Sequence, residues 1–233
     1  MKKLAAALSV LAAILGAAVF WLSGNIDGLI RDAIASYGTA MTQARVSVAA
    51  VRIAATDGTG TISNLVLANP AGFKTNHAIK VGRIDIDVDI ASLTKDVVVI
   101  RRIAIVAPDV IYEKGAAMTN FDAIQKNIAS YLGPSETKRE GRKLIVEELS
   151  IRDATAQASA AFMNGKTVSV PLPDITLKNI GKAKGGITPG ELGQEVAGAL
   201  KSRLTGAVNF DRLMKSTGQA LDKAGATIKG LFK

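Results

Sequence analysis

The sequence predicts an α+β protein. We expect an N-terminal transmembrane helix, a curved antiparallel β-sheet shaped as a trough or half-barrel, a short plugging helix and a C-terminal helical pair. An apolar run opens the chain, Ile84–Ile90 alternates strictly between apolar residues and Asp, and helical spacing returns after residue 188. The predicted domains are a membrane anchor with an amphipathic extension (1–43), the sheet (44–187) and the C-terminal helices (188–233).

Composition narrows the function classes. The 233 residues include no Cys and one His, which excludes disulfides and Cys or multi-His metal sites, and we expect no cofactor. The net charge of +9 favours nucleic acid or an anionic membrane as a partner. Because the charge is spread along the chain without aromatic interleaving, we expect membrane lipids and no nucleic acid.

The N-terminal apolar run predicts a membrane anchor. Met1, Lys2 and Lys3 precede Leu4–Leu22, which at about 1.5 Å per residue just spans a hydrocarbon core of about 30 Å. A cleaved signal peptide would be shorter and would end in small residues. This run ends in bulky residues, so an uncleaved anchor is favoured, with the N-terminus in the cytoplasm and the bulk across the membrane. The anchor residues are Leu4, Leu11, Phe20, Trp21 and Leu22.

An amphipathic helix should continue beyond the anchor. Its apolar stripe consists of Ile26, Ile30, Ala33, Tyr37 and Met41, and we expect it to end near Gly38. Packing against the first strands and contact with a lipid surface are both open for this stripe.

The strands share a change of phase in their apolar pattern. Val81 is out of phase with Ile84 across Gly82, and Ile105 gives way to Val110 across Pro108. Similar changes separate Val48 from Val51, Ile62 from Leu65, and Leu172 from Ile175. Bulges restore such a pattern and bend the strand, which predicts a curved sheet with an aliphatic trough.

Two segments resemble each other within the chain. Val98–Ile105 aligns without gaps with Leu144–Ile151, so that Arg101 and Arg102 face Glu147 and Glu148. Two ordinary amphipathic strands would look the same, so an internal repeat stays one of two interpretations.

Three helices follow from capping and spacing signals. Asn120 can cap a helix with Phe121, Ile124, Ile128 and Tyr131 on one face, ended by Gly133 and Pro134. Thr188–Glu191 is a capping box with Pro189 at the first helical position. From Asn209 a heptad seam suited to a partner helix comprises Phe210, Met214, Leu221, Ile228 and Leu231.

Candidate chemical sites are weak. His77 has no partner of a metal-binding type, so we expect a solvent-facing turn residue. Asp85, Asp87 and Asp89 share one strand face, which favours a solvated surface over a cation site. The stretch Gly181–Gly186 lacks the P-loop pattern and predicts a basic turn before a helix. We therefore expect no catalytic residues and no metal.

Several stretches resemble the AsmA family of bacterial envelope proteins. They are the N-terminal span, Gly60–Leu65, Asn69–Phe73, Ser92–Glu113, Asn120–Ile124, Val170–Asp174 and Gly181–Gly186. The resemblance implies a single-pass inner-membrane protein with its bulk in the periplasm and, as in large members, a hydrophobic β-groove for lipids. About eight strands at about 4.8 Å spacing give a sheet only about 40 Å long, too short to bridge an envelope.

Two functions from different classes remain. In the first, the protein is non-catalytic and holds lipid acyl chains in an aliphatic groove lined by Ile84, Ile86, Val88, Ile103, Ile105, Leu149 and Ile151. In the second, it is an accessory or scaffold subunit of a membrane protein complex. There its own helices fill the trough, and the heptad helix docks on a larger complex or a second copy. An enzyme is not expected.

Overall fold

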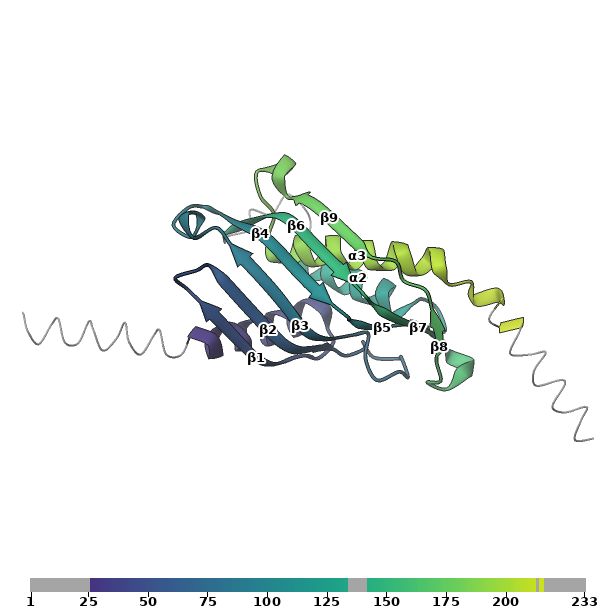
Figure 1. Cartoon of the computed structure of the whole chain (residues 1–233). Helices are drawn as coiled ribbons and strands as arrows, with labels where there is room; N and C mark the ends of the chain where they lie inside the picture. Colours follow the sequence, from purple (N-terminus) through teal and green to yellow (C-terminus); the bar gives the residue numbers. More distant parts are fainter. Residues whose placement is uncertain (1–25, 134–141, 213, 216–233) are drawn as a thin grey trace, which may run out of the picture.

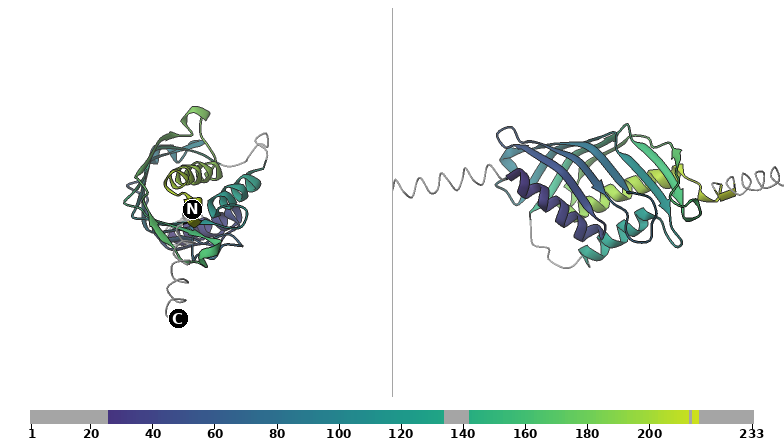
Figure 2. Two further views of the ribbon diagram at one scale, coloured as in Figure 1. Left: turned by 90° about the vertical axis from the view of Figure 1, so that its right-hand side faces the viewer. Right: turned by 90° about the horizontal axis from the view of Figure 1, so that it is seen from below.

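A nine-stranded sheet carries helices along one of its faces (Figures 1 and 2). The computed structural model describes residues 26–133, 142–212 and 214–215, and over these residues the α+β class is confirmed. The strands are β1 Val46–Ala54, β2 Thr59–Leu67, β3 Ile79–Val88, β4 Val97–Val106, β5 Asp109–Lys114, β6 Lys143–Arg152, β7 Thr155–Ala160, β8 Val168–Val170 and β9 Ile175–Ile180. Short 3₁₀ turns are η1 Ile90–Ser92, η2 Ala161–Met163 and η3 Lys182–Lys184.

The sheet is mixed, so the prediction of a purely antiparallel sheet is wrong. The strand order is β8-β7-β5-β3-β4-β6-β9, with β2 and then β1 on the other side of β3. The pairs β4–β6 and β5–β7 are parallel. Parallel neighbours need a long return connection, which here includes the helix Asn120–Leu132. The sheet has two free edges and is not the half-barrel that the sequence predicts.

Several strands are arranged end to end. β4 and β5 run along the same side of β3, since Arg83 pairs with Val106 and Lys80 with Asp109. β6 and β7 continue one another along β4 and β5 in the same way. Likewise, β9 and β8 pair with β6 and β7. The predicted alignment of Val98–Ile105 with Leu144–Ile151 is the observed strand pairing.

The predicted phase changes meet in one row across the sheet, which we call the break row. It comprises Ala49, Asn64, Gly82, Ala107, Asp153 and Pro173, and the regular pairing is interrupted at each of them. Asn64, Ala107 and Asp153 have φ angles of 50°, 49° and 54°, a left-handed conformation that is uncommon for residues other than Gly. Because all of these strands change phase at the same row, their residues stay paired in the same register on both sides of the row.

The helices begin at side-chain caps. α2 spans Asn120–Leu132, and its cap is Thr119 in a capping box with Asp122, not Asn120 as predicted. α3 spans Pro189–Ala207 and begins at the predicted Thr188 capping box. A further helix begins at residue 210, where Asn209 Oδ1 accepts a bond of 2.9 Å from the Arg212 amide.

The first described helix covers residues 26–42 and runs past its predicted end at Gly38. Thr42 Oγ1 donates to the Gly38 carbonyl at 2.7 Å, and the helix ends at Gln43 with φ 51°. Ile30 and Ile34 pack on the core while Ile26 and Tyr37 are exposed, so the buried stripe is rotated from the predicted one. No described helix is long and apolar enough to cross a membrane. The predicted anchor, residues 4–22, lies outside the described residues.

The main core lies between the sheet and the helices. Its fully buried members include Val110, Phe121, Val146 and Leu204. A second cluster joins the end of β2 to α2 and α3 through Leu67, Ile124, Ile128 and Ala197. The short helix α2, which was predicted to plug one end of the trough, therefore covers the apolar face directly, together with α3.

Candidate functional site

An apolar cavity of about 430 Å³ lies between the sheet and the helices. This volume falls within the range of about 300–1,000 Å³ that is usual for small-molecule sites. Its lining comprises Ile34, Gly38, Met41, Thr42, Val46, Leu65, Leu67, Ile79, Val81, Ile84, Ile105, Pro108, Val110, Phe121, Ile124, Ile128, Ile151, Pro189, Leu192, Gly193, Val196, Ala197 and Leu200.

The lining offers a ligand almost no polar contact. Thr42 is the one polar side chain among the described lining residues. Its hydroxyl already donates to the Gly38 carbonyl at 2.7 Å and lies 3.1 Å from the Ala44 carbonyl oxygen. A polar metabolite would lose hydrogen bonds on entering such a space, whereas hydrocarbon would lose none. The cavity is therefore suited to an apolar ligand.

Glycines bring the surrounding helices close together. A Cβ on Gly190 would lie 2.5 Å from the Leu132 side chain of α2, and one on Gly193 would lie 3.2 Å from Met41. Gly38 is equally tight against Val46 at the start of β1. The three helices therefore meet through small residues around the cavity, while larger aliphatic side chains of the sheet form its floor.

The predicted groove residues fall into three groups. Ile84, Ile105 and Ile151 line the cavity. Ile103 and Leu149 are buried in the core and Ile86 packs on it half-buried, but none of them lines the cavity. Val88 lies at the end of β3, away from it.

The helical half of the lining was missed by the groove prediction. Ile124 and Ile128 were recognised as one face of the short helix that was assigned to a plug, and Leu192 and Val196 lie on the helix that was predicted to begin at Thr188. The available signal was the spacing of small residues on α3, which indicates close helix contacts rather than a solid plug.

Beside the cavity, a buried polar network joins three of the stretches that carry the family resemblance. Asn120 is fully buried and donates through Nδ2 to Asn69 Oδ1 at 2.8 Å and to the Ile111 carbonyl at 2.7 Å. Its Oδ1 accepts from the Glu113 and Phe121 amides, both at 3.0 Å. All four bonding positions of this amide are therefore used.

The Glu113 carboxylate anchors the loop between β2 and β3. It is 1% exposed and accepts from the Lys74 amide at 2.7 Å, the Thr75 amide at 2.8 Å and the Thr75 hydroxyl at 2.6 Å. Asn69 Nδ2 closes the loop by donating to Thr75 Oγ1 at 2.7 Å. The network fixes β5, the β2–β3 loop and the start of α2 in one arrangement. Its donors and acceptors are saturated, which indicates a structural role.

His77 is not the solvent-facing residue that the sequence predicts. Its side chain is 14% exposed, and Nε2 lies 3.0 Å from Asp109 Oδ2, so the imidazole N–H donates to the carboxylate. Gln157 Nε2 donates to the other oxygen of Asp109 at 3.1 Å. These contacts tie the β2–β3 loop to β5 and β7. Within the described residues no three acidic, His or Cys side chains gather as a metal site requires.

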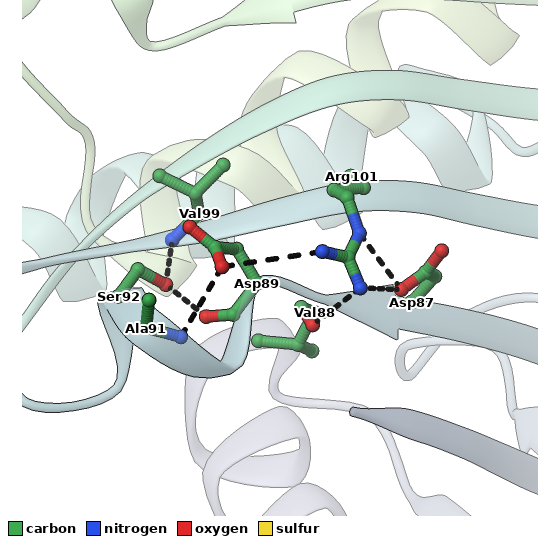
Figure 3. A network of polar contacts seen from close by, with 7 residues as sticks. All are labelled: Asp87, Val88, Asp89, Ala91, Ser92, Val99 and Arg101. Atoms are coloured by element: carbon green, nitrogen blue, oxygen red, sulfur yellow. Dashed lines mark hydrogen bonds and ion pairs between the residues drawn. The ribbon is translucent and has the colours of Figure 1, made fainter. Parts of the chain in front are cut away.

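The carboxylates of Asp85, Asp87 and Asp89 lie on the face of the sheet away from the helices. Each of them contacts a basic side chain or a backbone amide. Figure 3 shows Arg101 donating to Asp87 Oδ1 at 2.7 Å, with its Nη1 3.9 Å from Asp89. Asp89 also accepts from the Ala91 amide and so caps η1. Hydrogen bonds from Arg101 and Arg83 hold the pKa values of Asp87 and Asp85 below their ordinary range.

Opposite charges follow one another across four strands of this face. Asp87 of β3 pairs with Arg102 of β4, which pairs with Glu148 of β6, as predicted. Glu148 in turn pairs with Lys178 of β9, whose Nζ lies 3.8 Å from Glu148 Oε2. A slip of two residues between β4 and β6 would place Val146 or Ser150 opposite Arg102 and lose this contact, so the ladder favours the observed register.

The predicted partner seam begins inside the fold. Phe210 packs on the core, and its ring centroid lies 5.3 Å from that of Tyr112. Met214, one turn further, is 55% exposed. Leu221, Ile228 and Leu231 lie outside the described residues. The predicted basic turn is present as η3, flanked by Gly181 and Gly185 in the left-handed conformation.

No family model, no curated protein and no solved structure matches the chain. Its function must be argued from the cavity and the surface.

Proposed function

We propose that this protein is a non-catalytic, membrane-anchored lipid-handling module that holds an acyl chain in the cavity between its sheet and helices. The observation that carries the proposal is the cavity itself, with about 430 Å³ of space and a lining of aliphatic side chains. A lining of this kind offers water almost no hydrogen bonds, and apolar cavities bind hydrocarbon ligands.

The energetics favour a long hydrocarbon chain over a small apolar molecule. Each methylene transferred from water into such a space contributes about 0.8 kcal/mol, so a few methylenes already give useful affinity. The volume limits the site to one or two chains. The predicted trough then takes the form of a space that the sheet and three helices share, rather than an open groove.

The proposal places the module at a membrane. The apolar run Leu4–Leu22 after Lys2 and Lys3 supports a single-pass anchor with the N-terminus in the cytoplasm. The resemblance to the AsmA family supports a bacterial inner membrane, with the bulk of the protein in the periplasm. The buried network of Asn69, Glu113 and Asn120 agrees with that resemblance, because three of the stretches that carry it meet there.

A second function, an accessory subunit of a membrane complex, is supported by one observation. Met214 is 55% exposed, one turn after the buried Phe210, at the start of the predicted heptad seam. On this alternative the cavity is only loosely packed core, and the helix from residue 210 onward docks on a partner.

Photolabelling tests the proposal. The full chain in membranes is incubated with a fatty acid that carries a diazirine in its acyl chain, irradiated and digested. We expect adducts on peptides from Asn120–Leu132 and Pro189–Ala207, which supply the helical part of the lining. Adducts confined to residues 4–22 would contradict the proposal and favour the accessory subunit.

A matched pair of variants makes the test specific. Val196 lines the cavity, whereas Val146 is fully buried in the core away from it. Val196→Phe should lower labelling about tenfold, because occupying the space of two methylenes costs about 1.6 kcal/mol of binding. Val146→Phe adds the same volume outside the cavity and should leave the labelling of folded protein unchanged. Equal labelling of all three proteins would exclude the cavity as the site.

A further inference from the structure

Several turns meet at one end of the sheet, which we call the turn end (Figure 1). The β1–β2 turn touches the end of β3 and η1, since the Val88 amide donates to the Gly58 carbonyl at 2.8 Å and a Cβ on Gly58 would lie 2.9 Å from the Ile90 side chain. The start of β6 lies beside the β3–β4 turn, where the Lys143 amide donates to the Asp96 carbonyl at 3.1 Å. The turn around η3 packs on the same strand, because a Cβ on Gly186 would lie 2.7 Å from the Lys143 side chain.

The surface of the turn end combines exposed apolar and basic side chains. Ile90 and Leu93 are each 41% exposed, although both belong to a large apolar residue type. Arg142 lies directly against Leu93, with Nη1 donating to the Leu93 carbonyl at 2.6 Å. The exposed basic side chains of η1, β6 and η3 at this end are Lys95, Arg142, Lys143, Lys182 and Lys184.

Acidic groups around these residues are fewer and partly engaged. Asp89 and Asp96 belong to the same turn; Asp89 caps η1 and faces Arg101, and Asp96 is exposed. Asp57 precedes Gly58, where a Cβ would lie 2.9 Å from the Ile90 side chain, and Asp27 accepts from the Ile53 amide at 3.0 Å. Across the turn end, five basic side chains therefore stand with four carboxylates, and Asp27 and Asp89 are already engaged by backbone amides.

The chain enters the described fold at this same end (Figure 1). The bond between Asp27 and the Ile53 amide places the start of the first helix beside the β1–β2 turn. Ile26 and Leu29 are exposed there, at 38% and 57%. The sequence just before Ile26 contains the predicted anchor Leu4–Leu22, and only residues 23–25 separate the two. A bilayer that held this anchor would therefore lie next to the turn end.

We infer that the turn end docks on the surface of an anionic bilayer. Ile90 and Leu93 enter the boundary between headgroups and acyl chains, and the five basic side chains contact lipid phosphates. Apolar side chains inside a basic rim are the pattern of interfacial membrane contacts, whereas an acidic protein partner would need no exposed Ile and Leu at the centre. The inference rests on the proposed function in taking a membrane as the neighbour.

Docking in this orientation would also join the bilayer to the cavity. Half-buried isoleucines of the apolar face lie between the turn end and the break row, beyond which most of the cavity floor is found. They are Ile30, Ile53, Ile86 and Ile100. An acyl chain that left the bilayer at the turn end would therefore meet hydrocarbon along its path.

Depth measurements on the full chain test the docking surface without using the cavity. Because the chain contains no Cys, Leu93→Cys and Phe162→Cys each accept a single NBD label. Leu93 is 41% exposed at the turn end and Phe162 is 44% exposed in η2 at the other end of the sheet. The labelled proteins are placed in nanodiscs that contain doxyl-labelled lipids, with either anionic phosphatidylglycerol or zwitterionic phosphatidylcholine.

We expect NBD at position 93 to be quenched in anionic nanodiscs and NBD at position 162 to remain unquenched. Adding Lys182→Glu and Lys184→Glu should lower the quenching at position 93 by about twofold or more, because the reversed charges face anionic lipid. An unquenched label at position 93, or equal quenching at positions 93 and 162, would overturn the inference. Failure of photolabelling at the cavity with quenching retained would refute only the proposed function.

Discussion

Two neighbouring regions of the interior are built in opposite ways. Around Asn120 and Glu113, polar side chains are fully buried and each of their donors and acceptors is matched. A few residues further along α2, Ile124 and Ile128 face a cavity of about 430 Å³ with almost no polar lining. The polar region fixes the β2–β3 loop, β5 and the start of α2 in one arrangement. The apolar region leaves space between the sheet and helices that are fixed by contacts outside the cavity.

The comparison suggests why the cavity persists. A void in a protein interior normally costs stability and tends to collapse when its surroundings can move. Here α2 is fixed at its start by the polar network and is held against α3 by close glycine contacts such as Gly190 against Leu132. The surrounding helices therefore cannot close on the space. Four predictions test this contrast, in order of decreasing effect.

The largest effect is expected for Asn120→Ala in the polar region. The substitution removes four hydrogen bonds and leaves the Glu113 amide and the Ile111 carbonyl buried without a partner. We expect a loss of about 3–5 kcal/mol in the free energy of unfolding, measured with urea in mild detergent. Asn127→Ala on the same helix is the control. It removes one bond to the Thr42 carbonyl and should cost about 1 kcal/mol. Equal losses would show that the network is not special.

The next effect compares enlargement in packed and hollow surroundings. Val146→Phe forces extra volume into a fully buried site and should cost about 1–3 kcal/mol. Val196→Phe adds the same volume beside the cavity and should cost less than about 1 kcal/mol. Unfolding midpoints in urea measure both. A loss at Val196 as large as that at Val146 would mean that the space is not available to a side chain.

A smaller, pH-dependent effect is expected where α2 contacts α3. Burial raises the pKa of Asp122, but the Lys201 ammonium at 2.6 Å and the Thr119 donors outweigh it, so the pKa is lowered. Stability from this pair is therefore present above the unfolded value of 3.8 and is lost as pH falls through the folded value. Lys201→Met should cost about 1 kcal/mol at neutral pH. The difference from wild type should shrink below pH 3.8; a constant difference would contradict the pairing.

The smallest effect concerns the charge ladder on the outer face. Arg102 and Glu148 pair across parallel strands, so Arg102→Glu should place like charges opposite each other. Adding Glu148→Arg should restore part of the loss, with a coupling free energy of about 0.5 kcal/mol in a double-mutant cycle. Strictly additive losses would mean that the ladder contributes nothing to the register.

Local patterns in the sequence predicted much of the fold. The alternation in Ile84–Ile90 predicted a strand that the structure contains as β3, and the Thr188 capping box predicted the start of α3. The positions of the phase changes were also found, because a period of two makes every slip visible. The alignment of these phase changes in one row was not predicted, since it depends on pairing between distant segments of the chain.

The long-range features could not be read from local patterns. The parallel direction of β4 and β6 was not deduced, because the aligned segments were interpreted as repeat copies or as two ordinary strands of an antiparallel sheet. Asn120 looked like a cap because Asn is a common capping residue, but Thr119 takes that role and leaves the amide for the network. The cavity depends on the distance between helices and sheet, which periodicity does not encode. Three of the seven groove candidates, Ile84, Ile105 and Ile151, nevertheless line it.

Native mass spectrometry of the full chain, purified from membranes in mild detergent, tests the central claim most directly. We predict one or two bound acyl chains for wild-type protein, retention in folded Val146→Phe, and loss in Val196→Phe. Wild-type protein without bound lipid, or Val196→Phe with the same bound mass as wild type, would contradict the claim that the cavity is an acyl-chain site.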